Sequence, residues 1–358
     1  MKIDFIITSL RRGGAERVLV TLANNLVLRG NNVRVLTFKD AIEYELNEKI
    51  QHLFLEEKNI KNQTLSYTYA LFKFYKNNKH NKPNVAISFM TQTSLSAILV
   101  CKLLGIKIIA SEHTNHTRTS TNKSLVVFTR KHLYKYANFI TVLTKYDFDY
   151  YKNYTKNVIV MPNPCSFKLS ESKNTSKEKV ILAIGGLDKY NIKGFDNLLP
   201  IMKPILDKHK DWKIKIVGNS NNDGLTFLNN LVEELGIKNQ VIFTGLANNI
   251  QSMMKSSEIF VLSSRTEGLP MALIECMSQS MCCVAYDCVS GPSDIITHNV
   301  DGLLVENQNK NMMQKHITKV IEDENLRLRL SENANKITSK FDVELICDKW
   351  EKLILELQ

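Results

Sequence analysis

The chain has 358 residues, of which 44% are hydrophobic and 23% are charged, the composition of a soluble globular protein with room for two domains. Its apolar runs are far shorter than the about 20 residues that cross a bilayer. Its start, residues 1–8, lacks the apolar region and the cleavage site of a signal peptide. The seven cysteines include no Cys-x-x-Cys pair, so they indicate neither a disulfide framework nor a zinc site. These features predict a cytoplasmic protein.

The formal net charge is +11 at pH 7. Such an excess is typical of proteins that bind nucleic acid, an anionic membrane surface or phosphorylated substrates, although a plainly Lys-rich composition would also give it. The sequence contains no recognisable nucleic-acid-binding module, and its basic residues are mostly scattered lysines. We therefore favour a membrane or phosphate partner over nucleic acid.

The first half of the chain alternates strand and helix patterns. Short apolar runs predict strands at 2–8, 32–38, 84–90, 106–110, 139–143 and 158–161. Amphipathic patterns predict helices at 14–28 and 65–75, separated from each other by a strand and a polar stretch. Alternating strands and helices imply a parallel sheet that is covered on both faces.

A polar stretch with two prolines, 162–177, predicts a linker. A second alternation follows it, with strands predicted at 180–184, 213–217, 241–244, 259–262, 283–286 and 303–305. We expect an α/β protein of two doubly wound, Rossmann-like domains, 1–163 and 164–340, that face each other across a cleft. The last residues, 341–358, are predicted to form a separate amphipathic helix. Ligands of such sheets bind at the carboxyl ends of the strands.

The most informative motif, residues 263–275, follows the predicted strand 259–262 and reads Ser-Ser-Arg-Thr-Glu-Gly-Leu-Pro-Met-Ala-Leu-Ile-Glu. Gly268 and Pro270 break the chain and open a helix predicted over 271–280, with Pro270 expected in its first turn. The free N–H groups of such a helix start attract phosphate. Glu267 on the turn and Glu275 about one turn into the helix could hold a sugar and a ribose at the cleft. Taken alone, they could also be a solvated turn residue and a helix-dipole acid.

This Glu-x7-Glu spacing and five further motifs resemble the retaining nucleotide-sugar glycosyltransferases of the GT-B group called glycosyltransferase family 4. The further motifs are Ser9-Leu-Arg-Arg-Gly-Gly-Ala-Glu-Arg17, Ala110-Ser-Glu-His113, Met161-Pro-Asn-Pro164, Lys193-Gly-Phe-Asp196 and Ser290-Gly-Pro-Ser-Asp-Ile-Ile296. Each is weak alone, but their order and spacing are specific. The resemblance implies a GT-B fold with an acceptor-side first domain, a nucleotide-sugar second domain and a final helix that crosses back to the first.

The resemblance also implies roles for matching residues. His113 would contact the donor sugar, Lys193 would neutralise the departing diphosphate and Glu267 would hold the sugar, so these three are the predicted catalytic residues. The Gly13 and Gly14 loop would close over the diphosphate, the turn containing Leu246 would pack on the nucleobase, and Glu275 would bind the ribose. The predicted donor-binding set is Gly13, Gly14, Gly186, Leu246, Gly268, Leu269, Pro270, Met271 and Glu275.

The sequence departs from the family at Gly186, where an Arg usually completes a cationic clamp with the lysine. Lys189, Arg12 or Arg265 could replace that Arg, and the sequence does not choose among them. The departure puts half of the expected diphosphate site in question.

Two other residues near His113 are further candidates. His116 could contact the sugar instead, and Glu112 could be a general base, although no feature singles out Glu112. The Gly-Gly-Ala after the first strand does not match the Gly-x-Gly-x-x-Gly dinucleotide fingerprint, which argues against a nicotinamide enzyme.

One aromatic and basic segment of the first domain could meet a membrane. The predicted helix 65–75 and the residues after it interleave aromatic side chains with Lys73, Lys76, Lys79 and Lys82, and 118–135 adds Arg118, Lys123, Arg130, Lys131 and Lys135. This pattern suits a helix at an anionic bilayer surface. A helix that covers the sheet and has a solvated end would give it as well, and both readings stay open.

We therefore expect a cytoplasmic glycosyltransferase, either free or peripheral on the inner face of the cell membrane. It would move a hexosyl or N-acetylhexosaminyl group, with retention, from a nucleotide diphosphate donor to a hydroxyl of a lipid-linked or surface-polysaccharide glycan. A UDP-sugar is favoured because uridine donors are the commonest in the family, and the resemblance implies neither a metal nor a further cofactor. Two alternatives remain: a same-fold sugar-nucleotide enzyme without a glycan acceptor, and a degenerate, non-catalytic member that acts as a partner.

Overall fold

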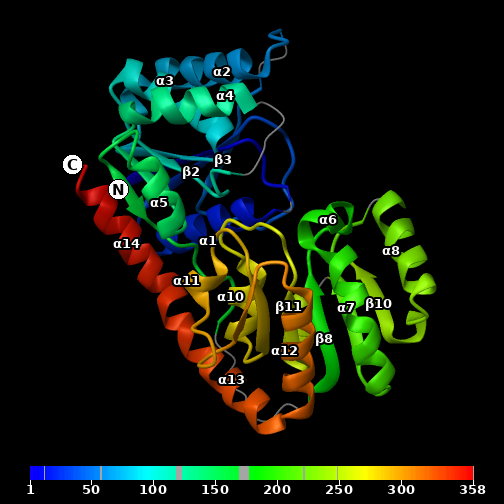
Figure 1. The fold of residues 1–358 in the computed structure, drawn as a ribbon. Helices are drawn as coiled ribbons and strands as arrows, with labels where there is room; N and C mark the ends of the chain where they lie inside the picture. Colours follow the sequence, from blue (N-terminus) through cyan, green and yellow to red (C-terminus); the bar gives the residue numbers. More distant parts are fainter. Residues whose placement is uncertain are drawn as a thin grey trace. The chain divides into compact units, whose positions relative to one another are not determined.

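The computed structural model of the chain describes residues 1–11, 13–56, 59–117, 123–168, 177–220, 222–247 and 249–357. These residues form two compact units (Figure 1). The first unit contains Met1–Ser166 and Phe341–Gln358, and the second contains Phe167–Lys340. Each unit is built on its own parallel sheet with helices between the strands, so the predicted α/β class is confirmed.

The first unit has a seven-stranded sheet in the order β3-β2-β1-β4-β5-β6-β7. All its strand pairs are parallel. The strands are Lys2–Ile7 (β1), Asn32–Thr37 (β2), Gln51–Phe54 (β3), Val85–Phe89 (β4), Lys107–Ser111 (β5), Phe139–Val142 (β6) and Val158–Val160 (β7). The two central strands, β1 and β4, are buried along almost their whole length because helices cover both faces.

The helices of the first unit include the C-terminal one. They are Gly14–Leu28 (α1), Gln63–Asn77 (α2), Thr91–Leu104 (α3), Lys123–Phe128 (α4), Lys145–Tyr151 (α5) and Val343–Leu355 (α14). Arg29, which caps α1, fastens α14 through Glu344, Asp348 at 2.7 Å and Glu351 at 2.9 Å. The two helices lie side by side in Figure 1.

A buried ion pair joins two neighbouring strands of the first sheet. Arg34 of β2 donates to both carboxylate oxygens of Asp4 on β1, at 2.7 and 2.6 Å. The two side chains are 2% and 0% exposed, and Tyr75 of α2 donates to the same carboxylate at 3.0 Å. A pair this deep is stable only because both charges are satisfied.

The second unit has a six-stranded sheet in the order β10-β9-β8-β11-β12-β13, again with parallel pairs. The strands are Glu178–Ile184 (β8), Lys213–Val217 (β9), Val241–Gly245 (β10), Ser257–Leu262 (β11), Cys282–Asp287 (β12) and Leu303–Glu306 (β13). The helices are Tyr190–Lys193 (α6), Phe195–Lys208 (α7), Asn222–Glu234 (α8), Ile250–Ser256 (α9), Met271–Ser278 (α10), Pro292–Ile295 (α11), Lys310–Glu322 (α12) and Glu324–Lys336 (α13).

Both sheets reverse their strand order at one place. In the first unit, β1 lies between β2 and β4, and in the second, β8 lies between β9 and β11. The loops that follow β1 and β4, or β8 and β11, therefore leave in opposite directions and open a crevice at the carboxyl ends of these strands. The candidate site residues must be sought at these two switch points.

The structure differs from the sequence prediction in three local features. It adds β3 in the stretch expected to be polar and irregular, because parallel pairing with β2 stabilises a half-buried edge strand that has no apolar run. Helix α10 ends at Ser278 rather than 280, and Ser280 takes a left-handed φ of 55°. Pro270 is the N-cap of α10, one position before the predicted first turn.

Part of the predicted linker is ordered. Cys165 is buried in the first unit, and its N–H donates to Phe341 O at 2.7 Å. The first unit therefore extends to Ser166, three residues beyond the boundary predicted from the sequence. Residues 169–176 of the linker lie outside the described residues.

Candidate functional site

Two predicted catalytic residues meet at the switch point of the second unit. Lys193 ends α6, and its Nζ donates to Oε1 of Glu267 at 2.8 Å. Ser264 Oγ donates to the same oxygen at 2.6 Å. The Lys193 and Glu267 side chains are only 25% and 13% exposed, so the ammonium group is held beside the strand end rather than free in solvent.

Close backbone packing puts Lys193 in this position. Gly194 follows it with a φ of 72°, and a Cβ there would stand 2.0 Å from Ser263 O. Ser263 Oγ donates to Lys193 O at 2.8 Å. A Cβ on Gly185 would stand 2.8 Å from Cγ of the lysine. Glycine is therefore required where the loops after β8 and β11 touch, and these contacts explain the Lys-Gly-Phe motif.

Arg265, one candidate to replace the missing family arginine, is paired within the second unit. Its two terminal nitrogens donate to both oxygens of Asp196, at 2.7 and 2.8 Å, and one of them also bonds Asn191 O. A bidentate pair of this kind fixes a guanidinium in one orientation. Arg265 thus fastens the loop after β11 to the start of α7, and this pairing argues against Arg265 as the second cation of the clamp.

Lys189 remains as a candidate for the second cation. It lies in the short turn Leu187–Lys189 directly after Gly186, and its side chain is exposed. At Gly186 itself, the space a Cβ would take is occupied by Oδ1 of Asp188, 2.4 Å away. Arg12, the third candidate, lies outside the described residues.

The loop before α10 is pressed against the loop after β12. Gly291 has a φ of 100°, and a Cβ there would stand 2.8 Å from Gly268 O and 2.6 Å from Cδ of Pro270. Ser290 Oγ donates to Gly268 O at 2.9 Å. Leu269 is 6% exposed and anchors this loop. The Ser-Gly-Pro motif at 290–292 therefore supports the turn that carries the Glu-x7-Glu motif.

The first turn of α10 starts at Met271 and has no side-chain cap. Its backbone N–H groups therefore suit an anion, since the helix dipole also favours negative charge there. Glu275 is the fifth residue of this helix and is 1% exposed. A carboxylate buried at that depth can bind a hydroxyl-bearing ligand group that reaches it, but it is not a solvated helix-dipole acid.

Two neighbouring strand ends complete the candidate rim of the second unit. A Cβ on Gly218, after β9, would stand 1.8 Å from Gly185 O, and Gly218 N donates to Gly245 O at 3.0 Å. Gly245 ends β10 with a φ of 67°. Leu246, the predicted nucleobase contact, follows with a side chain that is 51% exposed.

In the first unit, Gly13 and Gly14 open α1 at the carboxyl end of β1. Gly13 is its N-cap, and the hydroxyl of Tyr44 accepts from Gly13 N at 3.0 Å and donates to Gly13 O at 2.9 Å. A Cβ on Gly14 would meet no atom within 4 Å, so space remains beside the backbone there. Tyr44 was not found from the sequence, because it lies in a polar stretch about 30 residues further along the chain with no motif around it.

His113 follows β5 and stacks on Phe89 at the end of β4, with ring centroids 4.4 Å apart. Its Nε2 shares a hydrogen bond of 2.9 Å with Ser111 Oγ. Loss of water around the ring lowers the pKa of His113 to about 3, against a smaller opposing effect of Asn163. The imidazole is therefore neutral at pH 7, the form that can donate one hydrogen bond and accept another.

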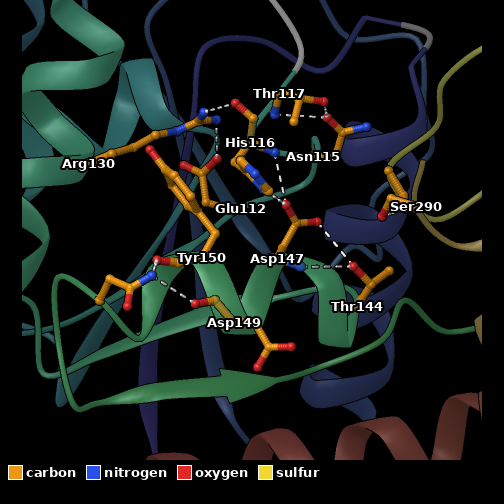
Figure 2. A network of polar contacts seen from close by, with 12 residues as sticks. Glu112, Asn115, His116, Thr117, Arg130, Thr144, Asp147, Asp149, Tyr150 and Ser290 are labelled. Carbon is orange, nitrogen blue, oxygen red and sulfur yellow. Dashed lines mark hydrogen bonds and ion pairs between the residues drawn. The ribbon is translucent and has the colours of Figure 1, made fainter.

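Glu112 is held in a buried network, which argues against the general-base role that the sequence left open. Its carboxylate is 2% exposed, pairs with Arg130 at 3.0 Å, and accepts from Thr91 Oγ1 at 2.6 Å and from Tyr134. Arg130 also donates to His116 O at 2.9 Å, as Figure 2 shows. A carboxylate held by three partners fixes the loop that carries His113.

His116 is likewise occupied. The Asp147 carboxylate accepts from the backbone N–H of His116 and contacts the ring Nδ1 of His116, each at 2.9 Å. Thr144 Oγ1 donates to the same carboxylate at 3.1 Å. The ring stacks between Tyr146 and Tyr150, at centroid distances of 4.8 and 4.0 Å. These contacts favour His113 over His116 as the loop's sugar-facing histidine.

The candidate residues thus lie within their own units at the carboxyl ends of the sheets, at the switch points or one or two strands away from them. His113, Gly13 and Gly14 belong to the first unit, and the remaining predicted residues belong to the second. Among the described residues, no group of three or more His, Cys, Asp or Glu side chains is arranged to hold a metal ion. In the same part of the chain, no helix is long and apolar enough to cross a membrane.

Comparison with known proteins identifies the family. Residues 12–167 match the model described as Glycosyltransferase Family 4, and residues 167–337 match the model described as glycosyl transferases group 1. The chain is 32% identical over 366 residues to a Campylobacter jejuni protein, and the match covers 100% of this chain and 99% of that relative. The chain belongs to this glycosyltransferase family.

The relatives and solved structures are consistent with each other. The Campylobacter protein is named GalNAc-alpha-(1->4)-GalNAc-alpha-(1->3)-diNAcBac-PP-undecaprenol alpha-1,4-N-acetyl-D-galactosaminyltransferase. The amylovoran biosynthesis glycosyltransferase AmsD of Erwinia amylovora is 29% identical, with 96% of each chain covered. The solved structure of Anabaena Alr3699/HepE in complex with UDP has a TM-score of 0.81 at 17% identity, covering 99% of this chain and 100% of that one. The fold is therefore GT-B, as predicted.

Proposed function

We propose that this glycosyltransferase moves a hexosyl or N-acetylhexosaminyl group from a UDP-sugar to a hydroxyl of a lipid-linked glycan, with retention at the anomeric carbon. The observation that carries the proposal is the second unit's switch point. There the Lys193–Glu267 pair lies in the loops beside the uncapped start of α10, with Glu275 buried in that helix. A cation, free N–H groups and two carboxylates suit a diphosphate with a sugar on either side.

Each group would have a distinct part in the reaction. Lys193 would leave Glu267 in part and stabilise negative charge on the departing diphosphate, Glu267 would then bind the transferred sugar, and Glu275 would bind the ribose. Lys189 would supply the second cation that Gly186 does not. We propose that no metal takes part, so EDTA should leave turnover unchanged.

The acceptor part of the proposal draws on the relatives. The 32% identical Campylobacter protein is named for an undecaprenol-diphosphate-linked acceptor, and AmsD is named for amylovoran biosynthesis. The choice of uridine is supported by the UDP bound to the similarly folded Alr3699/HepE. A lipid-linked acceptor would bring the enzyme to a membrane surface.

The test is thermal stabilisation of the protein by UDP, GDP and ADP. A nucleotide at 100 times its dissociation constant should stabilise the fold by about 2.7 kcal/mol. Glu275→Gln keeps the shape of the side chain and should lose most of that stabilisation. The control Glu306→Gln changes an exposed residue at the end of β13 and should keep the stabilisation by the nucleotide. Of the three nucleotides, UDP should stabilise the protein. Stabilisation by GDP or ADP instead would mean that the donor contains that nucleotide, and no response to any of them would overturn the proposed site.

A further inference from the structure

The positive charge of the chain is concentrated in one segment. Residues 59–138 contain 12 of the 47 basic residues and one of the 36 acidic ones, which gives this segment a charge of +11. The remainder then has 35 basic and 35 acidic residues and is neutral. A plainly Lys-rich composition would spread the excess along the chain, so it does not explain this distribution.

The one acid of the segment does not reduce the charge at the surface. It is Glu112, which is 2% exposed and paired with Arg130. The exposed charges that the segment contributes are therefore basic, among them Lys73 and Lys76 on α2, Lys102 on α3 and Lys131 after α4. Such a surface attracts anions over a distance of about one Debye length.

Helices of the same segment form one layer of the first unit, and its strands β4 and β5 lie in the sheet. The layer contains α2, α3 and α4, and α3 packs against both of the others. Figure 1 shows these three helices together along one side of the unit. Lys73, Lys76 and Lys102 are thus brought onto neighbouring helices, and Lys131 follows directly after α4.

The layer also exposes large apolar side chains between the lysines. Leu65 of α2 is 61% exposed, Leu103 of α3 is 72% exposed and Phe128 of α4 is 50% exposed. Leu65 and Phe128 also line a hollow of about 710 Å³ between their helices. Single exposed apolar residues are ordinary, but an apolar set within an all-basic layer is typical of a surface that enters the headgroup region of a bilayer.

Lysine and aromatic side chains pair on α2 and in the turn Tyr134–Tyr136 that follows α4. The ammonium groups of Lys73, Lys76 and Lys135 lie 6.0, 5.7 and 5.2 Å from the ring centroids of Tyr69, Phe72 and Tyr136. A lysine above an aromatic ring can keep its charge at the lipid phosphates while the ring lies deeper.

We propose that the outer face of α2, α3 and α4, the basic layer, docks onto an anionic bilayer, with Leu65, Leu103 and Phe128 entering it. The exposed leucines decide between a bilayer and nucleic acid, since aliphatic side chains gain from burial in lipid and do not stack on bases. Docking would bring the enzyme to the lipid-linked acceptor, and this purpose rests on the proposed function. The evidence for the face itself is its charge and its exposed side chains.

The experiment measures binding of the full chain to vesicles, without sugar or nucleotide. Vesicles of phosphatidylcholine with phosphatidylglycerol should bind the protein, vesicles of phosphatidylcholine alone should bind it weakly, and added salt should weaken the binding. Each basic residue near such a surface contributes about fivefold in affinity, so the variant Lys73→Gln, Lys76→Gln, Lys131→Gln should lose at least tenfold.

The control removes the same charge from the second unit, through Lys310→Gln, Lys315→Gln and Lys319→Gln on α12, and should bind vesicles like the parent protein. The variant Leu65→Ser, Leu103→Ser, Phe128→Ser keeps every charge and should also lose binding. Equal losses in both lysine variants would show that net charge alone acts, and absent vesicle binding in the parent would also overturn the proposal.

Nucleic acid is the remaining occupant to exclude. A single-stranded RNA oligonucleotide that binds as tightly as the vesicles, and is unaffected by the three serine substitutions, would overturn the proposal. UDP stabilisation should be the same in all these variants. Failure of vesicle binding with intact UDP binding would therefore leave the proposed transferase function standing, and the reverse result would leave the basic layer standing.

Discussion

The first and second units share one strand order around their switch points but hold the loops there by different means. In the first unit, side chains do so: Arg130 and Glu112 fix the loop of His113, and Tyr44 fixes the loop of Gly13. In the second unit, glycines pack the loops directly against neighbouring strand ends, and Arg265 and Ser290 add side-chain bonds. Loops held by glycine contacts leave N–H groups and space at the surface, which suits the binding of a phosphate.

The units also differ in charge. The first has 26 basic and 16 acidic residues, a net charge of +10, and the second has 21 and 20, a net charge of +1. The unit that contains the proposed donor site is thus almost neutral, and the cations proposed for that site are single residues at defined positions. The first unit's charge forms a broad field instead. We therefore propose a local anion site in the second unit, whereas the first unit has a broad surface that attracts anions.

The two tryptophans allow the units to be tested separately. Trp350 lies in α14 of the first unit and Trp212 precedes β9 of the second, and they are 2% and 3% exposed. A Trp212→Phe background therefore reports unfolding of the first unit by fluorescence, and a Trp350→Phe background reports unfolding of the second.

The largest expected effect is in the first unit. Asp4→Ala should lower its free energy of unfolding by about 3–5 kcal/mol, because it leaves the buried Arg34 without its charge partner. Urea unfolding followed through Trp350 measures this. The double variant Asp4→Leu, Arg34→Met removes both charges and should recover most of the loss. A single-variant loss below about 1 kcal/mol would mean that the pair does not brace the sheet.

The next effect tests the cation of the second unit. Lys193→Ala should reduce turnover by about 100- to 1000-fold, because a preorganised charge on the leaving group is removed. The affinity for UDP should fall much less. Steady-state kinetics with a UDP-sugar measures both, and Lys189→Ala is the matched control, with a smaller loss expected. Normal turnover in Lys193→Ala would exclude it from the diphosphate site, and a larger loss in Lys189→Ala would reverse the two roles.

A smaller effect tests the glycine contacts. Gly218→Ala should lower the free energy of unfolding of the second unit by about 1–3 kcal/mol, since the new Cβ collides with the backbone of Gly185. Urea unfolding followed through Trp212 measures this. Gly14→Ala in the first unit meets no atom within 4 Å and should cost almost nothing. Equal costs at the two positions would remove the contrast between the units.

The last effect concerns pH. The pKa of His113 is about 3 in the folded protein and about 6.5 unfolded, so the folded state favours the neutral ring. Its contribution to stability is complete above pH 6.5 and is lost as the pH falls towards 3. His113→Asn should therefore flatten the fall of the melting temperature over this window. If the melting temperatures of the two proteins differ by the same amount from pH 7 to about pH 4, the lowered pKa of His113 would be contradicted.

The sequence alone determined the class of fold and most of the elements. Apolar runs predicted strands that match β1, β2 and β4 closely, because strands buried on both faces need such runs. It did not determine β3, whose residues 51–54 alternate only weakly and become a strand through pairing with β2. It also placed the end of α10 two residues too late, since only the local backbone shows the left-handed turn at Ser280.

The motifs determined which residues to consider, because they follow predicted strands and ligands of doubly wound sheets bind at the carboxyl ends of the strands. They could not determine which of these side chains are held in ion pairs or hydrogen bonds with other residues. Only the tertiary structure showed that Arg265 is held by Asp196, that Glu112 is held by Arg130, and that Lys193 reaches Glu267. These partners come from distant parts of the chain, and a contact between distant segments leaves no spacing that one sequence reveals.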